Sequence, residues 1–153
     1  HLLLILLSDL LEQIAVFFYF IRPEPIPHQI HPCIQMIGEI WPVLELTLTN
    51  FGDVLTISEP LCKCFNNFIK SYEFHFIPLL PRLMDILVKS FENSGLSVYL
   101  WVSFNLIKNY AKDDGEEAVA CSQLVQKLSQ LVFIKMQGQQ VSDIPDGNDS
   151  IYF

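Results

Sequence analysis

Histidine and cysteine side chains lie close together at two places where their chemistry raises the question of a metal site. His28, His31 and Cys33 share one short segment. A structural zinc ion takes four Cys or His ligands, and no fourth ligand stands at a recognisable spacing from these three. Cys62 and Cys64 are separated by one residue, which directs them to different faces of a helix. Neither group predicts a metal site, and no cofactor is expected.

The chain shows no sequence pattern typical of a catalytic centre. A nucleophile motif, a glycine-rich phosphate loop and a histidine-centred triad are all missing from the sequence. Glu39 and Glu45 are the carboxylates near Trp41, and the solvated faces of a helix explain both. We therefore expect a protein that is not an enzyme.

Two polar stripes with helical spacing are the candidate binding residues. The first stripe advances by four, three and four residues, and the second is similar, so each lies on one helix face. The stripes consist of Glu59, Lys63, Asn66 and Lys70, and of Trp101, Asn105, Lys108 and Lys112. Each is either an ordinary solvated face or a ridge that binds a protein. Trp101 favours binding if it is exposed, because aromatic anchors often carry binding energy.

Composition limits the partners and the class of protein. Hydrophobic residues make up 51% of the chain and charged residues only 17%, so extensive disorder is excluded. The net charge of −8 disfavours direct binding of nucleic acid. The acidic surface either attracts a basic partner or serves solubility alone. The four cysteines form no disulfide framework, which indicates reduced thiols in a cytosolic or nuclear protein.

The apolar segment 2–21 is long enough to cross a membrane. Asp9, Glu12 and Gln13 interrupt its middle, and a central Asp costs about 2.5–3.5 kcal/mol on insertion scales. A signal peptide is disfavoured too, because a basic start is missing and the uninterrupted apolar run is short. We interpret the segment as a buried helix of a helical stack and expect no membrane association.

Apolar residues recur at helical steps throughout the chain, and no strand-like alternation persists. Pro32 suits a helix start, Thr56 or Ser58 can cap a third helix with Pro60 in its first turn, and Gly52 can end the second. The expected helices cover about 2–21, 32–50, 56–72, 76–92, 97–112 and 116–137, followed by a polar loop over 138–149.

An internal repeat indicates how these helices are arranged. Ile40–Leu44 and Leu79–Leu83 each carry a central proline, and the two prolines are 39 residues apart. Each proline is expected to lie inside the first helix of a pair and to kink it. A period near 40 with paired helices is typical of HEAT repeats. We predict an all-α HEAT-repeat solenoid; the alternative is a helical bundle with a coincidental proline.

The expected solenoid is larger than the chain, and residues 1–153 are interpreted as a fragment of it. Both ends of the chain are apolar. Neighbouring repeats would cover these ends, because each repeat of a solenoid contacts only its neighbours. Leu2–Leu7 and Ile151–Phe153 are therefore expected to be exposed apolar faces that promote self-association of the isolated piece.

Two stretches around the first repeat resemble a known family. His31–Cys33 and Glu39–Leu44 resemble the C-terminal half of the importin-β superfamily, with the greatest likeness to the transportin-SR group. Leu11–Phe17 and Ser97–Tyr110 resemble that group as well. The resemblance covers about residues 10–137.

The resemblance implies a nuclear import receptor. Such receptors are HEAT superhelices that shuttle between cytoplasm and nucleus, pass nucleoporins and release protein cargo when Ran-GTP binds. The implied cargo is SR-like or other RNA-binding proteins, with no direct contact to nucleic acid. Ran-GTP would bind through repeats mostly outside this segment. The second helix of each pair lines the concave surface, and here those are the third and fifth helices.

Animal members of the group carry an arginine ladder on the helix that matches 57–72, and it grips phosphorylated Arg-Ser repeats. The matching positions here are Pro60, Lys63, Asn66 and Lys70, so no arginine remains. Lysine keeps the charge but loses the bidentate fork that suits phosphate, so this departure puts recognition of phosphoserine in doubt. A cargo with unphosphorylated Arg-rich segments remains an alternative.

The expected cargo-binding residues are Glu59, Lys63, Asn66, Lys70, Trp101, Asn105 and Lys108. The alternative function is a HEAT scaffold of another assembly with no transport role. Sensitivity of cargo binding to Ran-GTP would separate a receptor from a scaffold.

Overall fold

The computed structural model of the chain describes residues 1–22, 24, 29–112 and 114–141, with side chains described through residue 138. Within these ranges the structure contains helices and no strand, which confirms the all-α class. The helices are α1 (Leu2–Phe20), α2 (Pro32–Phe51), α3 (Leu55–Tyr72), the 3₁₀ helix η1 (Glu73–Leu79), α4 (Leu80–Ser94), α5 (Ser97–Tyr110) and α6 (Glu116–Val141).

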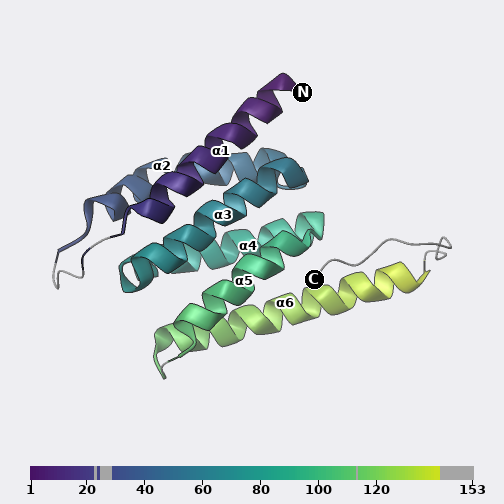
Figure 1. The fold of residues 1–153 in the computed structure, drawn as a ribbon. Helices are drawn as coiled ribbons and strands as arrows, with labels where there is room; N and C mark the ends of the chain where they lie inside the picture. Colours follow the sequence, from purple (N-terminus) through teal and green to yellow (C-terminus); the bar gives the residue numbers. More distant parts are fainter. Residues whose placement is uncertain (23, 25–28, 113, 142–153) are drawn as a thin grey trace.

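The helices stack in two layers (Figure 1). The front layer holds α1, α3 and α5 side by side, with α3 packed against both neighbours. The back layer holds α2, α4 and α6, and α4 contacts both of the others. Successive helices also pair between the layers, α2 with α3 and α4 with α5. This arrangement of stacked antiparallel pairs is the predicted solenoid.

Aromatic rings fill the core between the layers. Trp41 of α2 is fully buried, and its ring lies 5.6 Å from Phe65 and 6.2 Å from Phe76 between ring centroids. The indole Nε1 of Trp41 donates to Glu45 Oε1 at 2.7 Å, which satisfies the one polar atom of the buried ring. The guanidinium of Arg82 lies 5.9 Å from the Trp41 ring and 3.4 Å from the Glu45 carboxylate, so it ties α4 to α2.

The two prolines of the repeat occupy different positions, which corrects the expectation that both lie inside a helix. Pro42 does lie inside α2, but Pro81 is the second residue of α4. A proline at that position breaks no helical hydrogen bond, because the first N–H groups of a helix have no partner within it. The helix that was expected over 76–92 begins as η1 instead, because Pro78 disfavours α-helical backbone at the residue before it.

Pro60 lies in the interior of α3 and not in its first turn, because α3 begins at Leu55. Val54 precedes the helix without a side-chain cap, so the expectation of a Thr56 or Ser58 cap was wrong. Proline lacks the N–H that would bond the carbonyl four residues earlier. That carbonyl belongs to Thr56, and the Ser8 hydroxyl of α1 donates to it at 2.8 Å.

The C-terminal helix is longer and less covered than the sequence indicated. α6 continues to Val141, beyond the expected end at 137, because a single glycine costs a helix only about 1 kcal/mol and Gly138 is flanked by glutamines. The expected loop therefore does not begin at 138, and residues 142–149 lie outside the described residues. Phe133 of α6 is 62% exposed.

Helix α1 passes the length and hydropathy criteria for a membrane span. In the structure it packs against α3 through Leu11, Ala15 and Phe18. Most of its other apolar side chains are exposed, including Leu2, Leu3 and Leu6, so α1 is buried on one face only. Leu2, Leu3, Ile5 and Leu6 are exposed as predicted, whereas Leu4 and Leu7 are half-buried against the core. Ile151–Phe153 lies outside the described residues.

One tyrosine links α3 to α1 and another links α5 to α3, both at the same end of the layer. The hydroxyl of Tyr72, at the end of α3, donates to the Ile21 carbonyl at 2.8 Å. The hydroxyl of Tyr110, at the end of α5, donates to the Glu73 carbonyl at 2.6 Å. Ile21 and Glu73 are the residues that end α1 and α3, so the contact repeats with the helices.

We expect Tyr72→Phe and Tyr110→Phe each to lower the free energy of unfolding by about 1 kcal/mol, because each leaves a backbone carbonyl without its donor. Urea denaturation followed by circular dichroism measures the change. Tyr19→Phe is the matched control, because Tyr19 is exposed on α1 and should change stability little. Equal stability of all three variants would contradict a structural role for these bonds.

Candidate binding surface

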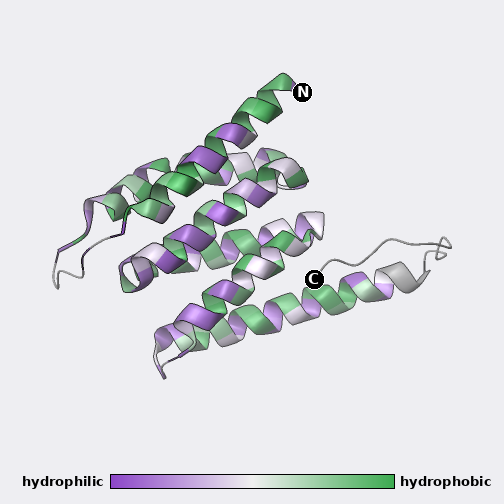
Figure 2. Cartoon of the chain, viewed as in Figure 1, coloured by the Kyte–Doolittle hydropathy of each residue, from purple (hydrophilic) through white to green (hydrophobic). Residues whose placement is uncertain are grey.

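The candidate residues lie on α3 and at α5, and we call the outer side of the layer of α1, α3 and α5 the front face. Figure 2 shows hydrophilic residues on this side of all three helices. The exposed members of the predicted set are Glu59, Lys63, Lys70, Trp101 and Lys108, and Asn105 is half-buried. The two predicted stripes thus lie on neighbouring helices of one layer.

Asn66 does not belong to the exposed stripe, which corrects its place in the predicted set. Its side chain is only 6% exposed. The helical rotation explains this burial. Asn66 is rotated away from the face that carries Lys63 and Lys70, toward the side of α3 that carries Cys62 and packs against α5. Asn67 turns the other way and its side-chain amide donates to the Ala15 carbonyl of α1 at 2.8 Å.

Lys63 forms an ion pair that the sequence did not indicate. Its Nζ lies 2.7 Å from Glu12 Oε1 of α1. Both side chains remain about half exposed, so the pair is worth little to stability and stays open to exchange with a ligand. The contact joins residues 51 positions apart, which no local pattern reveals.

Charge on the front face runs from acidic on α1 to basic on α5. α1 contributes Glu12, α3 carries both signs in Glu59, Lys63 and Lys70, and α5 contributes Lys108. Lys112, just after α5, is exposed as well. Trp101 stands on the same helix as Lys108, two turns earlier, and is 43% exposed. The face therefore offers an aromatic ring on the same side of α5 as Lys108, about 10 Å away along the helix.

The cysteines are poor nucleophiles. Burial raises the pKa of the Cys64 thiol to about 12, and burial raises the pKa of Cys62 further. Cys64 Sγ lies 3.4 Å from the Leu11 carbonyl on the α1 side, whereas Cys62 lies near Tyr99 on the α5 side. The two thiols thus face different neighbours, as the spacing predicted, and a buried neutral thiol is inert.

These raised values predict a loss of stability in alkali. A folded state that holds its thiol protons more tightly than the unfolded state keeps its full stability below about pH 9 and loses it as the pH rises toward 12. We expect the urea midpoint to be equal at pH 7 and 8 and lower at pH 10. Cys64→Ala should reduce this dependence relative to the unaltered chain, and an unchanged slope would contradict the assignment.

The histidine of the suspected metal group has a structural role. His31 Nδ1 accepts from the Cys33 amide at 3.1 Å and so caps α2, while Cys33 is buried. His28 lies outside the described residues. Within the part of the chain that the structure describes, no three His, Cys, Asp or Glu side chains converge as a metal site would require.

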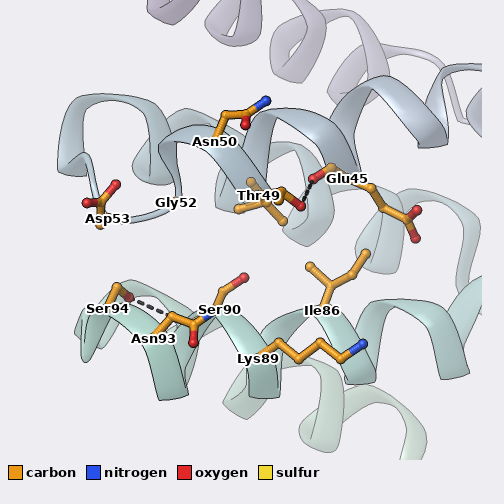
Figure 3. Close-up of a pocket in the computed structure, with 11 residues that line it drawn as sticks. Glu45, Thr49, Asn50, Gly52, Asp53, Ile86, Lys89, Ser90, Asn93 and Ser94 are labelled. Carbon is orange, nitrogen blue, oxygen red and sulfur yellow. Dashed lines mark hydrogen bonds between the residues drawn. The ribbon is translucent and has the colours of Figure 1, made fainter.

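A groove of about 610 Å³ lies between the C-terminal halves of α2 and α4 in the back layer (Figure 3). Two of its hydroxyl groups bond the backbone: Thr49 donates to the Glu45 carbonyl at 2.9 Å and Ser94 to the Ser90 carbonyl at 2.6 Å. The Glu45 carboxylate is engaged by Trp41 and Arg82. The groove therefore presents polar surface rather than an activated nucleophile and base.

Comparison with known proteins shows which family the chain is similar to. The family model described as the Transportin-3/Importin-13 fourth TPR domain matches residues 31–137. An uncharacterized protein of Schizosaccharomyces pombe is 29% identical over 148 residues, which is 95% of this chain and 15% of that protein. The mRNA transport regulator MTR10 of Saccharomyces cerevisiae is 24% identical over 112 residues, 71% of this chain and 12% of that protein.

No solved structure is significantly similar to the chain. The family match spans α2 to most of α6 and includes both complete helix pairs. The chain thus spans less than a sixth of the length of these relatives. It belongs to the Transportin-3/Importin-13 family of the importin-β superfamily of nuclear transport receptors.

Proposed function

We propose that this chain is a cargo-contacting segment of a nuclear import receptor. The observation that carries the proposal is the front face, where Trp101, Lys63, Lys70 and Lys108 stand exposed on adjacent helices of one layer. An exposed tryptophan beside charged side chains is a common anchor of protein interfaces. Family membership supplies the transport context.

The proposed cargo is a protein, and RNA-binding proteins of the SR-like type are the class we favour. One relative is named as a regulator of mRNA transport, which fits a receptor for proteins that accompany RNA. The net charge of −8 makes direct contact with RNA unfavourable. In this proposal the receptor shuttles between cytoplasm and nucleus, contacts nucleoporins, and binds Ran-GTP through repeats mostly outside this segment.

Release by Ran-GTP is the decisive test of the proposal. The full-length receptor is immobilised, loaded with proteins from a nuclear extract, and washed with Ran-GTP or with Ran-GDP. We expect RNA-binding proteins to elute with Ran-GTP and to stay bound with Ran-GDP. Partners that stay bound in both cases would indicate a scaffold with no transport role.

A pair of variants tests the front face in the same assay. Trp101→Ala with Lys108→Glu should reduce cargo capture by at least tenfold, because it removes the aromatic anchor and reverses a neighbouring charge. Lys89→Glu with Lys127→Glu is the control, because both lysines are exposed on back-layer helices. Equal capture by the two variants would place the cargo elsewhere on the receptor.

A further inference from the structure

The groove between the C-terminal halves of α2 and α4 is acidic at one end. Asp53, Asn93 and Ser94 lie at the end where the two helices stop (Figure 3). Asp53 is exposed and forms no ion pair with any residue that the structure describes. Lys89 also lines the groove, but its side chain runs toward Glu45 at the other end. The end beside Asp53 is therefore a negative site without a cation.

The end of α2 also leaves two backbone carbonyls without a backbone donor. Hydrogen bonds from the described backbone at this end reach the carbonyls of Leu48 and Phe51, but not those of Thr49 and Asn50 between them. The last carbonyls of a helix carry partial negative charge, which favours a cation near the helix end. The last turn of α2 contains no basic residue that could supply one. Thr49 and Asn50 line the groove, so the partial charge of the helix end adds to the charge of Asp53.

The next repeat shows how such a helix end is satisfied. Lys135 of α6 reaches the end of α4, where its Nζ donates to the Glu92 carbonyl at 2.8 Å. Glu92 stands three residues before Gly95, the residue that ends α4. Thr49 stands three residues before Gly52, which ends α2, so the two carbonyls occupy equivalent places in their helices. A lysine ammonium group occupies the first place, whereas the second borders an open groove.

We propose that the end of the groove beside Asp53 binds a lysine side chain of a partner protein. The ammonium group of that lysine pairs with the Asp53 carboxylate and donates to the carbonyls of Thr49 and Asn50, as Lys135 donates to Glu92. The groove volume of about 610 Å³ leaves room for the side chain and for part of the segment that carries it.

The chemistry of the site favours a lysine, and one that belongs to a different protein. An ammonium group is a compact cation with three donors, which suits one carboxylate and two separate carbonyl oxygens. A second copy of this chain is a poor source of the lysine, because two copies with a net charge of −8 repel each other. The site lies in the back layer, so binding there depends neither on the front face nor on the proposed function.

Carbodiimide cross-linking of the full-length receptor tests the proposal, because the reagent joins a carboxylate to an amine that contacts it. The probe is an acetylated and amidated heptapeptide of alternating glycine and lysine, whose only amines are lysine side chains. Peptide mass spectrometry compares the cross-linking yield at Asp53 with the yield at Asp85. Asp85 is the matched reference, because it is an exposed carboxylate of α4 that does not line the groove.

We expect the peptide to cross-link to Asp53 at least about fivefold more than to Asp85, which is the effect of one added charged contact. Asn93→Lys should lower the Asp53 yield by about the same factor, because it supplies an ammonium group in the groove from the receptor itself. Asn93→Gln is the control and should leave the yield nearly unchanged.

Two outcomes would contradict the proposal directly. The first is an equal yield at the two carboxylates, and the second is an Asp53 yield that Asn93→Lys does not lower. A cross-link of Asp53 to a lysine of a second receptor copy would overturn the proposal as well, because the occupant would then be another copy of the chain.

Discussion

Trp41→Ala is expected to lower the free energy of unfolding by about 3–5 kcal/mol, which is the usual range when a large aromatic side chain is removed from a core. Trp41 is fully buried between the layers, where it contacts Phe65 and Phe76. Its removal also leaves Glu45 without the indole donor and Arg82 without the ring beneath it. Urea denaturation of the full-length receptor, followed through this segment by hydrogen exchange, measures the loss.

The second tryptophan of the chain is the matched control. Trp101 is substantially exposed on α5, so Trp101→Ala should change the free energy of unfolding by less than about 1 kcal/mol. The two substitutions remove the same side chain from two sites that differ mainly in burial. A similar loss of stability for both would contradict the assignment of Trp41 to the core and of Trp101 to the binding surface.

Reversing the charge of the two exposed lysines on α3 is expected to distinguish a phosphorylated cargo from an unphosphorylated basic cargo. Lys63 and Lys70 are seven residues apart, so they share one exposed face of the helix. Lys63→Glu with Lys70→Glu should weaken a phosphorylated cargo by at least tenfold, about 1.4 kcal/mol, and should strengthen or spare an unphosphorylated basic cargo. Affinities are measured on the full-length receptor at low and at high salt, because screening weakens such contacts.

Two further variants make this experiment interpretable. Lys89→Glu with Lys127→Glu changes the net charge equally on the back layer and should leave both affinities nearly unchanged. Lys63→Gln with Lys70→Gln removes the charge without placing a carboxylate beside Glu12, the present ion-pair partner of Lys63. If Lys63→Glu with Lys70→Glu binds both forms of the cargo with unchanged affinity at low salt, then α3 does not contact the cargo.

The all-helical structure and the repeated pairing of helices were predictable from the sequence, because both depend on patterns of nearby residues. Apolar residues at steps of three and four define each helix, and the spacing of Pro42 and Pro81 indicated a period near 40, although the two prolines occupy different positions in their helices. The resemblance of His31–Cys33 and Glu39–Leu44 to the importin-β superfamily agrees with the family match over residues 31–137. Lys63 and Lys70 were placed on one stripe for the same reason, and the structure shows both exposed; the exposure of Trp101, on the stripe of another helix, was left open by the sequence.

Tertiary packing alone decided which sides of those helices are covered. Asn66 fits the polar stripe by spacing, yet it is buried because α3 has a neighbour on each side. Phe104 and Phe133 fit apolar stripes, yet both are exposed because no described helix covers that side of α5 and α6. The contacts of Lys63 with Glu12, of Tyr72 with Ile21 and of Tyr110 with Glu73 join residues 37–51 positions apart. Helical periodicity sets the direction of a side chain relative to its own helix, whereas only the packing of other helices determines what that side chain meets.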